Sequence, residues 1–77
     1  MEARVARLRA MIPVHRKRGL EAKVKADEAK ARMDNPRTPI IDQCESEVVY
    51  SAELRRAKAE ARLCEWYEYC IKQWTTA

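Results

Sequence analysis

The positions of the helix-breaking residues constrain the fold of this chain more than any other feature. The chain has 77 residues, with one glycine, three prolines and no phenylalanine. Asp34, Asn35 and Pro36 stand together near the middle, and no breaker follows Pro39. A composition rich in Ala, Glu, Lys, Arg and Leu is typical of long helices. The sequence therefore predicts one all-α domain over residues 1–77, made of two helical arms joined by a turn.

The second arm is predicted to be one long helix over residues 39–74. Thr38 is expected to cap it, with Pro39 at the first helical position and Asp42 in the first turn. Both tryptophans lie near its end. A packing face follows from residues at helical spacing, namely Ala52, Ala59, Leu63, Trp66, Cys70 and Trp74.

The first arm is predicted to be kinked or broken. A short helix over residues 2–12 is expected to meet an interruption at Pro13, with Gly19 adding further cost. A second helical segment is expected to start between residues 14 and 20 and to end at residue 33. Alanines and a methionine form a thin packing row in this segment at 4,3,4 spacing, namely Ala22, Ala26, Ala29 and Met33.

Folding back about the turn pairs the arms as an antiparallel hairpin. The predicted register sets Ile12 near Leu63 and Leu8 near Trp66, and it sets small residues against small ones next to the turn. A chain this short has a marginal core, and bulky side chains remain outside the packing face, so we expect a dimer or larger assembly. The predicted oligomer interface comprises Leu63, Trp66, Tyr67, Cys70, Ile71 and Trp74.

Charge divides the chain into two unlike halves. Residues 1–37 carry eleven bases and five acids, a net +6, whereas residues 38–77 carry five bases and seven acids, a net −2. The basic half favours an anionic partner. It is equally compatible with a solvated basic face that only offsets the acidic, more apolar half.

Several classes of protein are not expected. The three cysteines lack the paired spacing of zinc sites, and we interpret them as reduced. No run of about 18 apolar residues predicts a membrane span or a signal peptide, so a cytoplasmic protein without a membrane association is expected. His15 has no acid near it in sequence, and there is no glycine-rich phosphate loop, so we expect neither an enzyme nor a cofactor.

The positive signal is a set of basic residues on a helix, with aromatic residues elsewhere. Phosphate contacts from such bases give salt-sensitive, sequence-independent affinity. The candidate nucleic-acid-binding residues are Lys23, Lys25, Lys30, Arg32 and Arg37. Aromatic rings that stack on bases are also common at such sites. The candidates are Trp66, Tyr67, Tyr69 and Trp74, which we interpret first as core or interface residues.

The stretch Leu20–Asp34, reading LEAKVKADEAKARMD, resembles the central helix of phage recombination mediators. These small helical proteins load a RecA-like recombinase onto single-stranded DNA. The resemblance implies that Lys30, Ala31 and Arg32 match a triplet associated with DNA binding, and that the long C-terminal helix mediates assembly into a ring. The aromatic and glycine residues that follow the triplet in the family are replaced here by residues 35–37.

The leading hypothesis is therefore a non-enzymatic, oligomeric, single-stranded DNA-binding accessory protein of phage recombination, with a RecA-like recombinase as a further partner. The alternative is a hairpin that binds an acidic protein, such as a phage-encoded inhibitor or an assembly subunit. A coiled-coil dimer without a ligand is the third hypothesis.

Overall fold

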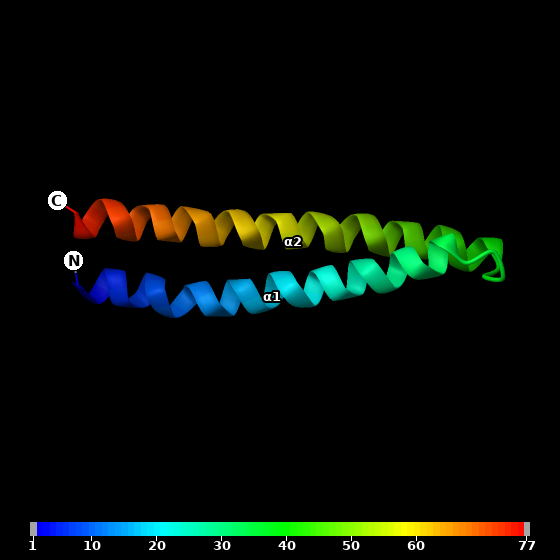
Figure 1. The fold of residues 1–77 in the computed structure, drawn as a ribbon, viewed down its shortest axis with the longest axis horizontal. Helices are drawn as coiled ribbons and strands as arrows, with labels where there is room; N and C mark the ends of the chain where they lie inside the picture. Colours follow the sequence, from blue (N-terminus) through cyan, green and yellow to red (C-terminus); the bar gives the residue numbers. More distant parts are fainter. Residues whose placement is uncertain (1, 77) are drawn as a thin grey trace.

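The computed structural model describes residues 2–76, which form two antiparallel helices joined by a short turn (Figure 1). Helix α1 spans Glu2–Asp34, and helix α2 spans Ile40–Thr75. The helices run side by side, so the start of α1 and the end of α2 lie at the same end of the rod. The rod measures 57 × 15 × 12 Å. The predicted all-α helical hairpin is confirmed.

The turn between the helices is organised by Asn35. Its side-chain oxygen accepts a hydrogen bond from the backbone N–H two residues further on, at 3.0 Å. Its carbonyl accepts one from the backbone N–H of Thr38, at 3.1 Å. Gln43 then donates from α2 to the carbonyls of Asn35 and Thr38, at 3.2 and 2.9 Å. The predicted start of the helix is wrong in detail, because Pro39 and not Thr38 is the capping residue.

The predicted interruption of the first arm is also wrong, because α1 is helical through both Pro13 and Gly19. Proline removes the hydrogen bond to the carbonyl of Arg9 and costs about 3 kcal/mol inside a helix. Pro13 lies on the exposed face of α1, where water can bond that carbonyl, while Ile12 and His15 pack toward α2. Packing on both sides of Pro13 therefore outweighs its local preference.

One continuous row of each helix faces the other, with residues spaced alternately by three and four. Every member of both rows is buried or half-buried. The row on α1 is Val5, Leu8, Ile12, His15, Gly19, Ala22, Ala26, Ala29 and Met33. The row on α2 is Gln43, Ser46, Tyr50, Glu53, Ala57, Glu60, Cys64, Tyr67, Ile71 and Trp74.

The predicted packing face of α2 is wrong by one step around the helix over residues 52–66, whereas Trp74 does lie in the row that faces α1 and Cys70 is half-buried beside it. Ala59 and Trp66 are exposed, whereas Cys64 is buried and its Sγ donates to the carbonyl of Ile12 at 3.6 Å. Leu63 is the predicted neighbour of Ile12, so the lengthwise register is right to within one residue. One residue along a helix rotates a side chain by about 100°, and this rotation places a different row against α1.

Small residues on α1 let the helices approach closely. A Cβ atom added to Gly19 would lie 3.4 Å from the Cβ of Glu60 and 3.8 Å from the carbonyl oxygen of Ala57. Three alanines nearer the turn are almost fully buried, namely Ala22, Ala26 and Ala29.

The side chains that fill this space are larger than predicted. Gly19 lies near Ala57 and Glu60, and Ile12 lies near Cys64. The same register, continued toward the turn, brings Tyr50 opposite Ala26 and Glu53 opposite Ala22. The predicted pairing of small residues with small ones next to the turn is therefore wrong.

The hairpin exposes more surface than a compact protein of its mass. Its accessible surface is 6158 Å², whereas a compact monomer of 9.0 kDa has about 4,900 Å². Ile40, Ile41 and Val48 near the turn are 70 to 78% exposed. Neither helix, over the residues described, has an apolar stretch long enough to cross a membrane.

The close approach at Gly19 predicts opposite effects for two substitutions. Gly19→Ala is expected to raise the free energy of unfolding by about 0.5–1 kcal/mol, because helix propensity improves and the added methyl makes an ordinary contact. Gly19→Leu is expected to lower it by about 1–3 kcal/mol, because the side chain overfills the space. Urea unfolding followed by circular dichroism measures both values. Ala10→Leu, on the exposed face, is the control for the size change.

Candidate nucleic-acid interface

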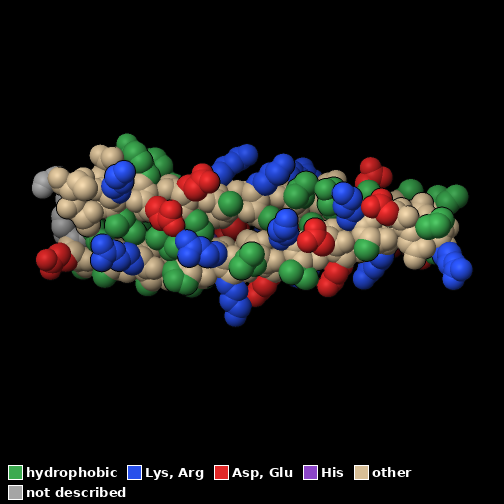
Figure 2. Space-filling view, in the orientation of Figure 1, with side chains coloured by type: hydrophobic (Ala, Val, Ile, Leu, Met, Phe, Trp, Pro, Cys, Tyr) green, Lys and Arg blue, Asp and Glu red, His purple; other side chains and the backbone are tan. Residues whose placement is uncertain are grey.

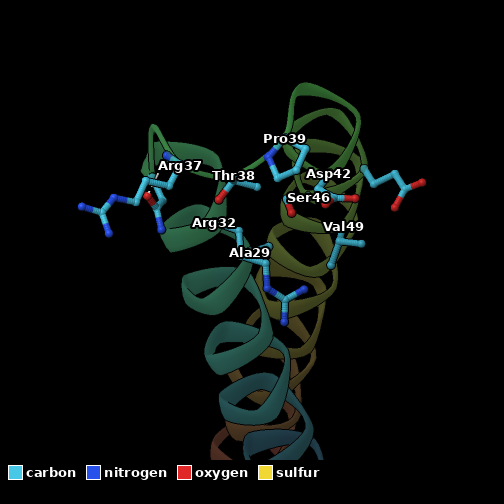
Figure 3. A pocket seen from close by; sticks show the side chains of 10 residues that line it. Ala29, Arg32, Arg37, Thr38, Pro39, Asp42, Ser46 and Val49 are labelled. Atoms are coloured by element: carbon cyan, nitrogen blue, oxygen red, sulfur yellow. Dashed lines mark hydrogen bonds between the residues drawn. The ribbon is translucent and has the colours of Figure 1, made fainter.

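The predicted nucleic-acid-binding residues are all exposed, but the structure does not bring them together on one face. Lys23 and Lys30 lie on one flank of the packing row of α1, and Lys25 and Arg32 lie on the other. Arg37 is in the turn and points away from α2 (Figure 3). The candidate set therefore divides into two separate surfaces.

Basic residues recur along each flank of α1 at intervals of seven, except where Met11 interrupts the second flank. The first, which we name the Lys30 flank, consists of Arg9, Arg16, Lys23 and Lys30. The second, which we name the Arg32 flank, consists of Arg4, Arg18, Lys25 and Arg32. In an antiparallel pair, each flank of one helix lies beside one flank of the other. The neighbours on α2 decide how much of the positive charge is neutralised.

Acidic residues of α2 lie beside the Lys30 flank. Arg16 Nη2 donates to Glu68 Oε1 at 3.1 Å, in a pair that is more than half exposed. Lys23 lines the same shallow groove as Glu65 and Glu68. Its charge is therefore partly offset by carboxylates.

The Arg32 flank lies beside a less acidic part of α2. Near the turn it borders a groove that Arg32 and Arg37 line together with Asp42, Glu45 and Val49 of α2, and Arg32 points across it from α1 (Figure 3). Farther from the turn, the same side of α2 carries Arg56 and Leu63. Among residues 2–76, Arg16 is the only Lys or Arg side chain in an ion pair with a carboxylate. The Arg32 flank therefore has four bases outside any such ion pair and the Lys30 flank has three, although Lys25 lines a shallow hollow with Glu21 and Glu28.

Basic and acidic side chains are interspersed on the face of the rod seen in Figure 2, with hydrophobic groups between them. The net charge of the chain is thus not gathered into one dense patch on this face. A linear ligand that follows one flank would meet repeated positive charges, whereas a compact anion would meet few at once.

The four candidate aromatic residues divide between the inside and the outside of the hairpin. Tyr67 packs in the row facing α1, with its ring centroid 5.5 Å from that of His15. Trp74 is half-buried in the same row, and the guanidinium of Arg4 lies 5.9 Å from its ring centroid. Trp66 and Tyr69 are exposed, so this pair does not belong to the core of the hairpin, and its assignment to an interface stays a prediction.

The six predicted interface residues also occupy different surfaces. Tyr67, Ile71 and Trp74 belong to the row that packs on α1, and Cys70 is half-buried beside it. Leu63 and Trp66 face outward, at 37 and 58% exposure. The outward-facing members are the most accessible to another molecule while the hairpin stays closed.

A buried polar pair between the helices is absent from the sequence predictions. His15 Nδ1 and Glu60 Oε2 are in hydrogen-bonding contact at 2.5 Å, and their side chains are only 10 and 14% exposed. The acid that His15 lacks in sequence is supplied by α2, 45 residues away. The sequence does contain a sign that His15 faces α2, because His15 continues the 3,4 spacing of the apolar residues on α1.

The cysteines lie apart as free thiols, with Cys44 exposed, Cys64 buried and Cys70 half-buried. Within the described part of the chain, no three His, Cys, Asp or Glu side chains are grouped so that they could hold a metal ion.

The sequence matches no known family model, and neither the curated proteins nor the solved structures contain a match to it.

The two glutamates paired across the hairpin give a matched test of burial. Glu60→Ala is expected to lower the free energy of unfolding by about 1–3 kcal/mol, because His15 is left buried without its partner. Glu68→Ala removes an exposed pair on the same helix and is expected to cost less than about 1 kcal/mol. If urea unfolding gives the same decrease in the free energy of unfolding for both variants, the buried contact of His15 with Glu60 stabilises the fold no more than the exposed pair does.

Proposed function

We propose that the protein is a non-enzymatic accessory protein that binds single-stranded DNA along the Arg32 flank. The observation that carries the proposal is a set of four bases, none of them in an ion pair within residues 2–76, that lie on one side of a continuous helix at spacings of seven or fourteen residues. From Arg4 to Arg32 this flank extends about 42 Å. A polyanion lying along it meets several cations at once, whereas a small anion does not.

Phosphate contacts explain how such a surface binds. Each Lys or Arg that neutralises a phosphate releases condensed counterions, so affinity rises without reading the base sequence and falls as salt increases. Lys25 and Arg32 supply these contacts, and Arg18 on the same flank extends the line. Arg56 on α2 lies on the same side of the hairpin and adds a further charge.

A role in recombination follows from the resemblance of Leu20–Asp34 to recombination mediators. The matching triplet contains Lys30 and Arg32, which the helix places on opposite flanks. Arg32 is therefore the residue of the triplet that contacts DNA under this proposal. A RecA-like recombinase is the protein partner that the resemblance implies.

Self-association belongs to the same proposal. The excess of exposed surface over that of a compact monomer supports it, because a chain this small gains stability when a second copy covers apolar side chains. Ile40, Ile41 and Val48 are the most exposed of its large apolar residues. Light scattering over a range of protein concentrations should give a mass that rises toward a multiple of one chain. A constant mass of one chain would remove self-association from the proposal.

A second candidate function is binding to an acidic protein. The same unpaired flank supports it, together with the apolar side chains near the turn, since such interfaces combine charge complementarity with apolar contact. A single-stranded oligonucleotide and an acidic polypeptide of equal charge discriminate between the two functions. Preference for the polypeptide would favour this second candidate.

The two flanks make the main test internally controlled. The Lys25→Ala, Arg32→Ala double variant is expected to bind labelled single-stranded DNA more weakly and to reduce the slope of log affinity against log salt by roughly 1.4, because two phosphate contacts are lost. A second double variant, Lys23→Ala with Lys30→Ala, removes the same charge from the other flank. It is expected to change the affinity and the salt slope much less. Titrations between about 50 and 200 mM salt measure this. No binding by the unaltered protein at the lowest salt would refute the proposal, and equal losses in the two variants would refute the choice of flank.

A further inference from the structure

Trp66 and Tyr69 form an exposed aromatic pair on the outer surface of α2. Their ring centroids are 5.6 Å apart and their planes are inclined by 22°, so the rings are stacked. The residues are 58 and 54% exposed. Arg62 and Glu65 line a shallow hollow with them. Two large rings in water are unusual in a small monomer, since their burial normally contributes to the core.

The hairpin itself makes this exposure necessary. Cys64 and Tyr67 occupy the row that faces α1, so the residues between and beside them turn outward. Trp66 then stands on the same side of the rod as the Arg32 flank, because Trp66 adjoins the row of α2 that contains Arg56 and Leu63.

Positive charge surrounds the pair on its N-terminal side. The segment from residue 55 to residue 62 contains four exposed bases, namely Arg55, Arg56, Lys58 and Arg62. Its one acid, Glu60, turns inward and is held by His15 between the helices. The exposed surface of this segment therefore carries no compensating carboxylate, although Glu65 lies at the edge of the hollow.

We propose that Trp66 and Tyr69 form a platform on which an unpaired nucleobase stacks, while Arg62 and the neighbouring arginines contact the adjoining phosphates. Exposed flat rings beside guanidinium groups suit single-stranded nucleic acid, because every base has a π-face and duplex DNA keeps its bases stacked on one another. The charge around the pair selects this occupant over an uncharged apolar one. The inference deepens the proposed function and rests on it, because it adds base contacts to a phosphate-binding flank.

The test compares two fluorescent oligonucleotides of equal length and charge, one of deoxythymidine and one with abasic sugars throughout. The unaltered protein should bind the first more tightly, and Trp66→Ala should abolish that preference through a loss of about 5- to 150-fold for the thymidine strand. Binding to the abasic strand should not change. Trp66→Phe, which keeps a ring, should retain part of the preference, and Trp74→Phe, which alters a ring in the packing row, should retain all of it.

The possible outcomes separate this inference from the function on which it rests. Equal affinity for the two strands would overturn the stacking platform and leave phosphate binding intact. Failure to bind either strand at low salt would overturn both proposals. A second readout uses Trp74→Phe protein, in which Trp66 is the sole tryptophan: the thymidine strand should quench its fluorescence and the abasic strand should not. Quenching by neither strand would also overturn the platform.

Discussion

The close approach of the two helices at Gly19 determines which surfaces the protein presents. A residue no larger than alanine at this position lets α1 lie against Ala57 and Glu60, and the nearly buried alanines continue this approach toward the turn. Small residues leave a groove along α1 that longer side chains from α2 fill. His15, one turn away, adds a polar requirement, because a buried imidazole needs a hydrogen-bond partner and Glu60 supplies it. Space and the hydrogen bond between His15 and Glu60 thus select the same row of α2, although Glu53 Oε2 in this row is buried without a hydrogen-bond partner among the described residues.

The row selected is the more polar of two candidates on α2, and this choice gives the protein its exposed features. Ser46, Glu53 and Glu60 face α1, while Leu63 and Trp66 face outward. Burying the carboxylate of Glu60 also removes the one acid from a run of exposed bases. The same packing divides the basic residues of α1 between two flanks with different neighbours. The proposed DNA-binding surface is therefore a product of how the hairpin packs, and it is not evident from the charge of either half alone.

The sequence predicted the two arms, the turn and the lengthwise register, because the breakers at residues 34–39 and the matched lengths of the arms are local and strong signals. It predicted a break at Pro13 because proline is unfavourable inside a helix, and the packing of α1 on both sides of Pro13 is not evident from the local sequence. The face of α2 was missed for a different reason. Two rows of α2 have the same 3,4 spacing, and ranking them by hydrophobicity favours the row with Leu63 and Trp66. Only the contacts of His15 and Gly19 with α2 decide between them, and these depend on residues about 40 positions apart. For the same reason the sequence indicates a basic first helix but does not show that its bases lie on two separate flanks.

The proposed surfaces depend most on Trp66 facing outward from a single hairpin, and the fluorescence of that residue tests this orientation directly. In Trp74→Phe protein, diluted until light scattering gives the mass of one chain, Trp66 is the only emitter. The structure predicts emission close to that of tryptophan in water and ready quenching by acrylamide, because the residue is 58% exposed. Emission shifted to shorter wavelength, together with protection from acrylamide, would place Trp66 against α1 and contradict the packing on which the proposed surfaces depend.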